Sequence, residues 1–292
     1  MSIMQTVLQS SHFMVINHVC QRPRVDCGGP QGDEPARFIF TRRGSFAVHA
    51  EGRTCFARPG KAVLVFKNVE YRITHPDTES CDCCTDVWID DQVLDMLELT
   101  GIPAPCCELT HDLQFQKTHV ELLVGLRHGG HRSPEDAEEV LLDTLASLLQ
   151  SSHFTFRLPA RRNAVARQVA RVEEAIIGDV SENLDVHVLA NIAGCSPFHL
   201  CRIFRSRTGL SLRQFRLQQR LGTALGRLGD GEEDLAALAC DVGFSSHSHM
   251  TEAFRQSLGA SPSALREELR RSDLSRLGRR LRGTALARNR SI

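Results

Sequence analysis

The chain has 292 residues and lacks any apolar run of about 20 residues, the length that a membrane-spanning helix needs. Met1 to Cys20 lacks a basic segment followed by an apolar core, so we expect no secretion signal and a cytoplasmic protein. The 11 cysteines are an odd number, and a reducing compartment argues against a disulfide framework. The length suits two domains, and 41% hydrophobic residues suffice for a core in each.

The sequence motifs of common enzymes are also missing. There is no glycine-rich phosphate loop, no nucleophile elbow and no HExxH motif. A catalytic barrel would hold a metal through paired histidines and a glutamate, but His49 has no second histidine two residues later and His75 is isolated. We therefore expect that the chain is not an enzyme. The alternative is a metal-dependent barrel enzyme, which would need the histidine pair that the sequence lacks.

Lysine is absent from Ala160 to the end of the chain. This part holds 21 Arg against 14 Asp and Glu, a net charge of +7, whereas the rest of the chain carries −7. A basic C-terminal half suggests a polyanionic partner such as nucleic acid, although the two halves could also differ by chance.

Short strands are predicted from Arg37 to Trp88, because β-branched and aromatic segments alternate there with glycine-containing turns. The segments read RFIF, SFAVHA, TCFA, AVLVF, EYRIT and TDVWI. Closely spaced short strands indicate a small sandwich or barrel.

Two helices are predicted after the strands, over His119–Arg127 and Pro134–Gln150. Ser133 can cap the second helix, with Pro134 at its first position. An apolar stripe on this helix could pack on the barrel or pair with a second subunit, and in the second case it predicts a homodimer. The stripe contains Leu141, Leu145, Leu148 and Leu149, of which we take the first three as the dimerisation candidates.

An internal repeat occupies the C-terminal half. Six residues have counterparts 50 residues later: Leu200, Phe204, Gly209, Ser211, Phe215 and Arg216 match Met250, Phe254, Gly259, Ser261, Leu265 and Arg266. Upstream, Leu189, Ala190 and Gly194 match Leu238, Ala239 and Gly243 at an offset of 49. A loop can absorb the one-residue difference.

Each copy predicts a helix, a glycine turn and a second helix. In the first copy Leu184–Ala193 leads, Gly194 ends that helix, and Ser196 caps the next one, whose apolar side we expect to include Phe198. In the second copy Leu235–Asp241 leads and Ser246 caps. Such units are helix-turn-helix motifs, whose second helix fits the major groove.

The helix predicted over Leu212–Arg227 bridges the two units, which could then enter successive major-groove segments roughly 34 Å apart. An ordinary helical repeat that binds nothing is the alternative.

The stretches DVHVLANIAGCSPFHLCRIFRSRTGLSLRQF and DLAALACDVGFSSHSHMTEAFRQSLGASPSALR closely resemble the DNA-binding domain of the AraC-type (AraC/XylS) transcription regulators, with the family's signature from Ala239 to Pro262. The upstream barrel resembles the cupin-like effector domain of such regulators more weakly. The resemblance implies an α+β chain: an N-terminal cupin-like β-barrel with helices and a C-terminal all-α double helix-turn-helix domain. It implies a sequence-specific regulator, usually an activator that recruits RNA polymerase, with double-stranded DNA and a small-molecule or metal effector as further partners.

The expected organisation has four segments. They are a sensing and dimerisation domain over 1–152, a linker over 153–163 (HFTFRLPARRN), a DNA-binding domain over 164–271, and a loosely ordered basic tail over 272–292.

The resemblance also assigns the outward, DNA-facing positions of the two second helices. They are Phe198, Cys201, Arg202 and Arg205 in the first, and His247, Ser248, Thr251 and Glu252 in the second. Arg202 could fork to guanine or to phosphate, whereas Glu252 can accept from a cytosine amine but repels phosphate. Cys201 departs from the polar residues expected there. Each of these side chains could instead be solvated or face a phosphate.

Eight of the cysteines precede residue 110, and five lie in two tight groups, CDCC and PCC. These five, Cys81, Cys83, Cys84, Cys106 and Cys107, could form a tetrahedral thiolate site for zinc or another thiophilic ion. They could instead be a redox or electrophile sensor, in which activated thiolates form a disulfide or an adduct. The third interpretation is that they are buried and act as small apolar residues. The second hypothesis for the whole chain is therefore a regulator whose cysteines sense a metal or thiol stress.

Overall fold

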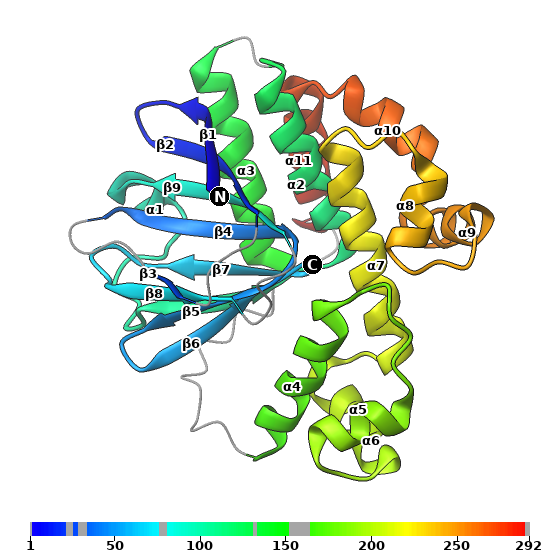
Figure 1. Cartoon of the computed structure of the whole chain (residues 1–292). Helices are drawn as coiled ribbons and strands as arrows, with labels where there is room; N and C mark the ends of the chain where they lie inside the picture. The colour runs from blue at the N-terminus through cyan, green and yellow to red at the C-terminus, as the bar shows by residue number, and fades with distance from the viewer. Residues whose placement is uncertain are drawn as a thin grey trace.

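The computed structural model describes residues 2–21, 26–28, 34–75, 81–130, 133–151 and 164–289. The linker expected over 153–163 lies outside these ranges. Figure 1 shows the strands on one side of the molecule, with α4–α6 and α8–α10 as two helical groups on the other side and α7 between them.

Ten strands form two antiparallel sheets in the described part of the chain. The larger sheet has the order β1-β2-β9-β4-β7-β10, and the smaller one has the order β3-β8-β5-β6. Their bounds are β1 Ser2–Gln9, β2 Phe13–Cys20, β3 Asp26–Gly28, β4 Ala36–Arg43, β5 Phe46–Ala50, β6 Arg53–Ala57, β7 Lys61–Val65, β8 Tyr71–Thr74, β9 Asp82–Ile89 and β10 Cys106–Thr110. All six predicted strands are confirmed as β4 to β9, whereas β1, β2, β3 and β10 were not predicted.

All helices except α1, which precedes β10, follow the strands along the chain. Their bounds are α1 Asp91–Met96, α2 Leu113–Arg127, α3 Pro134–Ser151, α4 Ala164–Gly178, α5 Val186–Ala193, α6 Pro197–Thr208, α7 Leu212–Gly229, α8 Leu235–Asp241, α9 His247–Leu258, α10 Pro262–Arg270 and α11 Leu274–Asn289. Among the helices that the structure describes, none combines the length and the hydropathy required to cross a bilayer. The fold is therefore α+β, as the sequence predicted, with the strands in the N-terminal part and all helices but α1 after them.

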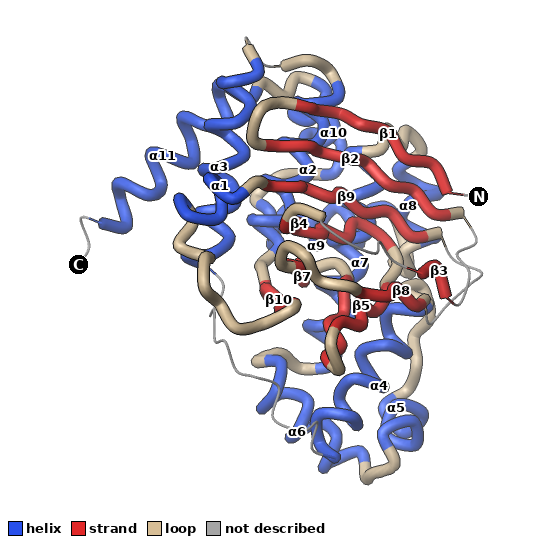
Figure 2. The backbone as a smooth tube through the Cα atoms, turned by 90° about the vertical axis from the view of Figure 1, so that its left-hand side faces the viewer, coloured by secondary structure: helices blue, strands red, loops and turns tan. Residues whose placement is uncertain are grey.

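The central strands of the larger sheet, β4, β7 and β9, are buried on both faces. Successive side chains of a strand point to opposite faces. In β4, Phe38 and Phe40 pack in the cluster shared with the helices, whereas Ile39 between them packs against the smaller sheet. Figure 2 shows α2, α3 and α11 beside this sheet. The N-terminal half thus has two cores, one between the sheets and one between a sheet and helices.

The leucine stripe of α3 belongs to the second of these cores. Leu141, Leu145 and Leu148 are each at most 1% exposed and pack with side chains of β2, β4, α2 and α11. Ser133 caps the helix as predicted, because its hydroxyl accepts from the Asp136 amide at 3.3 Å. The interpretation of these leucines as a dimer surface is wrong for this structure, since the chain's own core already covers them.

The expected loose tail is a helix. Leu274 and Leu277 of α11 are buried against α2 and α3, and Arg282 pairs with Asp143 at 3.0 Å. Arg280 pairs with Glu121 of α2, which is itself buried. The tail therefore packs on the N-terminal half, and its many arginines are used partly in structural ion pairs.

The two halves of the chain share a core. Val120 and Val124 of α2 pack in one cluster with the apolar residues of α7–α10. Glycines of α7 allow this approach: a Cβ at Gly226 would lie 3.0 Å from the carbonyl oxygen of Arg42, and one at Gly229 would lie 2.4 Å from Val120. The helix-turn-helix half is therefore docked on the sandwich and on α2.

Buried histidines at this junction make the stability of the chain depend on pH. Burial lowers the pKa of His111 to about 4 and lowers that of His119 well below its usual value. The unfolded chain then binds more protons than the folded one below about pH 6.5. We expect the free energy of unfolding to be highest above about pH 6.5 and to fall by about 3 kcal/mol toward pH 4 for His111 alone. Urea unfolding at a series of pH values measures this loss, and His111→Asn should flatten it. An unchanged slope in that variant would contradict the assignment.

Candidate nucleic-acid interface

The second helix of the first unit, α6, begins and ends as its sequence dictates. Gly194 adopts the left-handed conformation that ends α5, with φ of 68°. The hydroxyl of Ser196 then accepts from the His199 amide at 3.3 Å, and Pro197 occupies the first helical position. Leu200 and Phe204 are fully buried in a core shared with α4, α5 and α7. These contacts fix which face of α6 points to solvent.

The four predicted outward residues of α6, Phe198, Cys201, Arg202 and Arg205, are exposed. Phe198 is 82% exposed, so the expectation that it also packs on the apolar side of the helix is wrong. A guanidinium nitrogen of Arg202 lies 3.2 Å from Nδ1 of His199, one turn earlier. In the part of the chain that the structure describes, no carboxylate pairs with Arg202 or Arg205. The charge of this face is therefore available to an anionic partner.

The second helix of the second unit, α9, follows the same plan. Ser246 accepts from the His249 amide at 3.1 Å, and Met250 and Phe254 are fully buried. His247, Ser248 and Glu252 are exposed, and Oε1 of Glu252 accepts from the side-chain amide of Gln256 at 2.7 Å.

Thr251 differs from the other predicted positions of α9. It is only half-exposed, and its hydroxyl oxygen is covered without a hydrogen-bond partner among the described residues. Thr251 is therefore the predicted contact that is least accessible to a ligand on this surface.

Two further side chains beside the predicted positions were not predicted from the sequence: His199 of α6 is half-exposed and Arg255 of α9 is exposed. The repeat could have revealed Arg255, since the offset of 50 residues aligns it with Arg205.

Helix α7 holds the two units at its opposite ends (Figure 1). It starts with a capping box, in which Ser211 and Gln214 each satisfy a backbone amide of the other. Its 18 residues span about 27 Å, somewhat less than the roughly 34 Å pitch of the duplex. The predicted bridge is confirmed as a single helix.

Acidic residues near the second unit are neutralised within the fold. Arg227 pairs with Glu232 at 2.5 Å and with Asp241 at 2.7 Å. Arg127 and the buried Arg42 both pair with Asp230. These acidic groups therefore add little negative charge beside the second unit, and the exposed face of the first unit carries Arg202 and Arg205.

Comparison with known proteins identifies this architecture. A helix-turn-helix domain model matches residues 189–268. The regulatory protein SoxS of Salmonella typhimurium is 30% identical over 90 residues, which are 31% of this chain and 84% of SoxS. The chain belongs to the AraC-type family of transcription regulators. The Msm operon regulatory protein of Streptococcus mutans is 28% identical over 129 residues, 44% of this chain and 46% of that protein. The chain thus spans less than half the length of the longer relatives that it matches.

A solved structure covers more of this AraC-type chain. ToxT from Vibrio cholerae O395 is similar over 88% of this chain and 98% of ToxT, with a TM-score of 0.36 and 13% sequence identity.

The five cysteines that were grouped from the sequence lie apart in this AraC-type chain. Cys81, Cys83 and Cys84 lie at or just before the start of β9, and Cys106 and Cys107 begin β10, with β4 and β7 between these strands in the sheet. No group of three or more metal-ligating side chains occurs in the parts of the chain placed by the structure. The five cysteines therefore do not form a single site. The two groups lie on strands of the same sheet that have two other strands between them.

The thiols form two close pairs instead. The Sγ atoms of Cys81 and Cys83 are 3.8 Å apart, and those of Cys55 and Cys106 are 3.2 Å apart. A hydrogen bond with Cys83 and the charge of Arg43 lower the pKa of Cys81 to about 6. Burial raises the pKa of Cys84 and raises that of Cys107 to about 12. The N-terminal half therefore contains one thiol with a lowered pKa and two thiols with raised pKa values.

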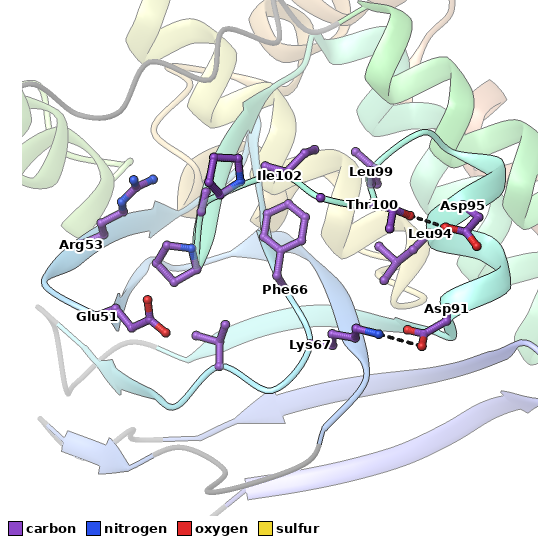
Figure 3. Close-up of a pocket in the computed structure, with 15 residues that line it drawn as sticks. Glu51, Arg53, Phe66, Lys67, Asp91, Leu94, Asp95, Leu99, Thr100 and Ile102 are labelled. Atoms are coloured by element: carbon purple, nitrogen blue, oxygen red, sulfur yellow. Dashed lines mark hydrogen bonds and ion pairs between the residues drawn. The ribbon is translucent and has the colours of Figure 1, made fainter.

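A cavity of about 610 Å³ opens at one end of the sandwich, beside α1 (Figure 3). Apolar side chains of Phe66, Leu94 and Ile102 line it together with the charged Arg53. Lys67 at its edge pairs with Asp91 at 2.7 Å. The size of the cavity is in the range of small-molecule sites, although its lining contains more charged groups than such sites usually have.

Proposed function

We propose that the chain is a sequence-specific transcription regulator that binds double-stranded DNA through α6 and α9. The observation that carries this proposal is the repeated pair of capped helices, each with a buried apolar face and an exposed polar one. Exposed arginines on α6 supply the phosphate attraction that non-specific and specific DNA binding both need. Because α7 carries both units, one chain can address two groove segments without a partner subunit.

The N-terminal half is proposed to sense a signal and to change how the two units are held. Several contacts support such a coupling. The guanidinium of Arg58, after β6, lies 4.8 Å from the ring centroid of Phe215 and pairs with Glu173 at 2.9 Å. Lys117 of α2 pairs with Glu268 of α10 at 3.0 Å. A ligand that favours one arrangement of the sandwich would shift the populations of these contacts.

Two kinds of signal are compatible with this proposal. The cavity beside α1 suits a small organic ligand, and the paired thiols suit a thiol-reactive signal. Activation through RNA polymerase is the mode that the family resemblance implies. Metal sensing by the cysteines has less support, since they lie in separate pairs.

The test is gel retardation of promoter-containing duplexes by the purified full chain over a range of salt concentrations. We expect retardation that weakens steeply as salt rises, because binding releases counterions from the phosphates and a high salt concentration opposes that release. An absence of retardation at low ionic strength would contradict the proposal.

A further inference from the structure

Two buried thiols face each other where the two sheets meet. Cys55 lies in β6, at the edge of the smaller sheet, and Cys106 lies in β10, at the edge of the larger one. Their Sγ atoms are 3.2 Å apart, with the Cys55 thiol donating to Cys106. Cys55 is 6% exposed and Cys106 is 2% exposed. A disulfide has an S–S distance of about 2.05 Å, so the sulfurs need to approach by only about 1 Å.

The other thiols of the sandwich are less suited to such a bond. Cys107 packs in the core next to the helices, on the opposite face of β10 from Cys106. The thiol of Cys84 donates to Asp86 at 3.7 Å. Cys81 and Cys83 are two residues apart along one extended segment, where Cα atoms are separated by about 6.6 Å, close to the upper limit of about 6.8 Å for disulfides. The pair between β6 and β10 is therefore the best placed.

Sequence neighbours of both cysteines line a cavity on the surface of the sandwich. Arg53, two residues before Cys55, and Pro105, next to Cys106, both line the cavity beside α1. In the described sheets, β6 pairs only with β5 and β10 only with β7, so both strands are edges that can open locally.

We infer that Cys55 and Cys106 form a reversible redox site, which a peroxide converts to a disulfide between the two sheets. The Cys106 thiolate attacks one oxygen of hydrogen peroxide, which gives a sulfenic acid and releases hydroxide. The Cys55 sulfur then attacks the sulfenic sulfur, the S–S bond forms, and water leaves with the Cys55 proton. The two thiols lose two electrons and two protons in total, and one peroxide is reduced to two waters.

The bond would tie together two segments that hold the helix-turn-helix half. Three residues after Cys55, Arg58 contacts Glu173 and Phe215. After Cys106, β10 continues through Asp112, the cap of α2, into the helix that packs on α7. Oxidation is thus expected to change DNA affinity. This consequence rests on the proposed function, but formation of the disulfide does not depend on it.

The test maps disulfides in the full chain after titration with hydrogen peroxide. Free thiols are blocked with N-ethylmaleimide in denaturant, and the unreduced chain is digested with trypsin and a glutamate-specific protease. Cys55 then lies in the peptide Thr54–Lys61 and Cys106 in the peptide Leu99–Glu108. We expect these two peptides to be the most abundant linked pair and to separate on reduction. A dominant link elsewhere, or none at these peptides while other cysteines are oxidised, would overturn the inference.

Two variants complete the design. Cys106 and Cys107 lie in the same peptide, and Cys107→Ser distinguishes them. This variant should keep the link to Cys55, and loss of the link would show that Cys107 forms it. Retardation of DNA by reduced and oxidised chains should differ at least threefold, and Cys55→Ala should abolish that difference. A mapped link with equal affinities overturns the coupling alone. A mapped link in a chain that never retards DNA leaves the redox site intact and contradicts the proposed function.

Discussion

Alanine at both Arg202 and Arg205 is expected to lower the affinity for promoter DNA about a hundredfold or more at fixed salt. Both guanidinium groups are exposed on α6, and no described carboxylate pairs with them. An arginine that forks to a base contributes about 1–3 kcal/mol, and a phosphate contact adds to the salt dependence. Arg202→Ala alone should cost about 1–3 kcal/mol if this side chain reads a base. Gel-shift titration of the single and double variants measures both values.

The matched control is Arg271→Ala, which removes the same charge from the end of α10. The side chain of Arg271 is 77% exposed and pairs with Glu267 on its own helix, away from α6. We expect its DNA affinity to stay within about twofold of that of the unmodified chain, since surface ion pairs contribute little. Equal losses in the control and the double variant would mean that general charge, and not this face of α6, determines binding.

Leucine at Gly226 is expected to separate the two halves of the chain and to lower the free energy of unfolding by about 2–3 kcal/mol. A Cβ at this position would lie 3.0 Å from the carbonyl oxygen and 3.1 Å from the Cβ of Arg42. The first of these atoms belongs to the backbone of β4, which cannot move aside as the end of a flexible side chain could. Urea unfolding followed by fluorescence of Trp88, the single tryptophan, and by circular dichroism measures the loss.

Trp88 reports on the sandwich, whereas circular dichroism reports mainly on the helices. In the Gly226→Leu variant the two signals should change at different urea concentrations, because the docked halves no longer unfold together. Gly178→Ala is the control: it lies in α4 with nothing within 4 Å of an added Cβ, and alanine is the better helix former. An unchanged stability for Gly226→Leu would contradict the docked arrangement.

Much of the fold could be predicted because local chemistry determined it. Apolar segments between glycine turns predicted β4 to β9, and capping serines with turn glycines predicted both helix-turn-helix units. The burial of Leu200 and Phe204 followed from the helical spacing, whereas the set of outward residues on α6 came from the family resemblance. These features depend on neighbours in sequence, so a single sequence contains them.

The errors arose where distant segments decide the structure. Periodicity showed that the leucines of α3 are buried, but it could not show that α11 and the sheet cover them. The arginines of α11 concealed the buried Leu274 and Leu277. Strand β10, with the sequence CCELT, forms because it pairs with β7. For the same reason the spacing of the cysteines could not reveal that Cys106 faces Cys55, which lies 51 residues away.

Binding of α6 and α9 to adjacent turns of one duplex leaves a specific pattern on DNA, which hydroxyl-radical footprinting of a retarded promoter fragment detects. We predict two protected segments on one face, about 10 base pairs apart. Arg202→Ala with Arg205→Ala should weaken one of them selectively, and replacement of His247 and Ser248 by alanine should weaken the other. A single protected segment, or protection that none of these changes alters, would show that the two helices do not bind DNA in this way.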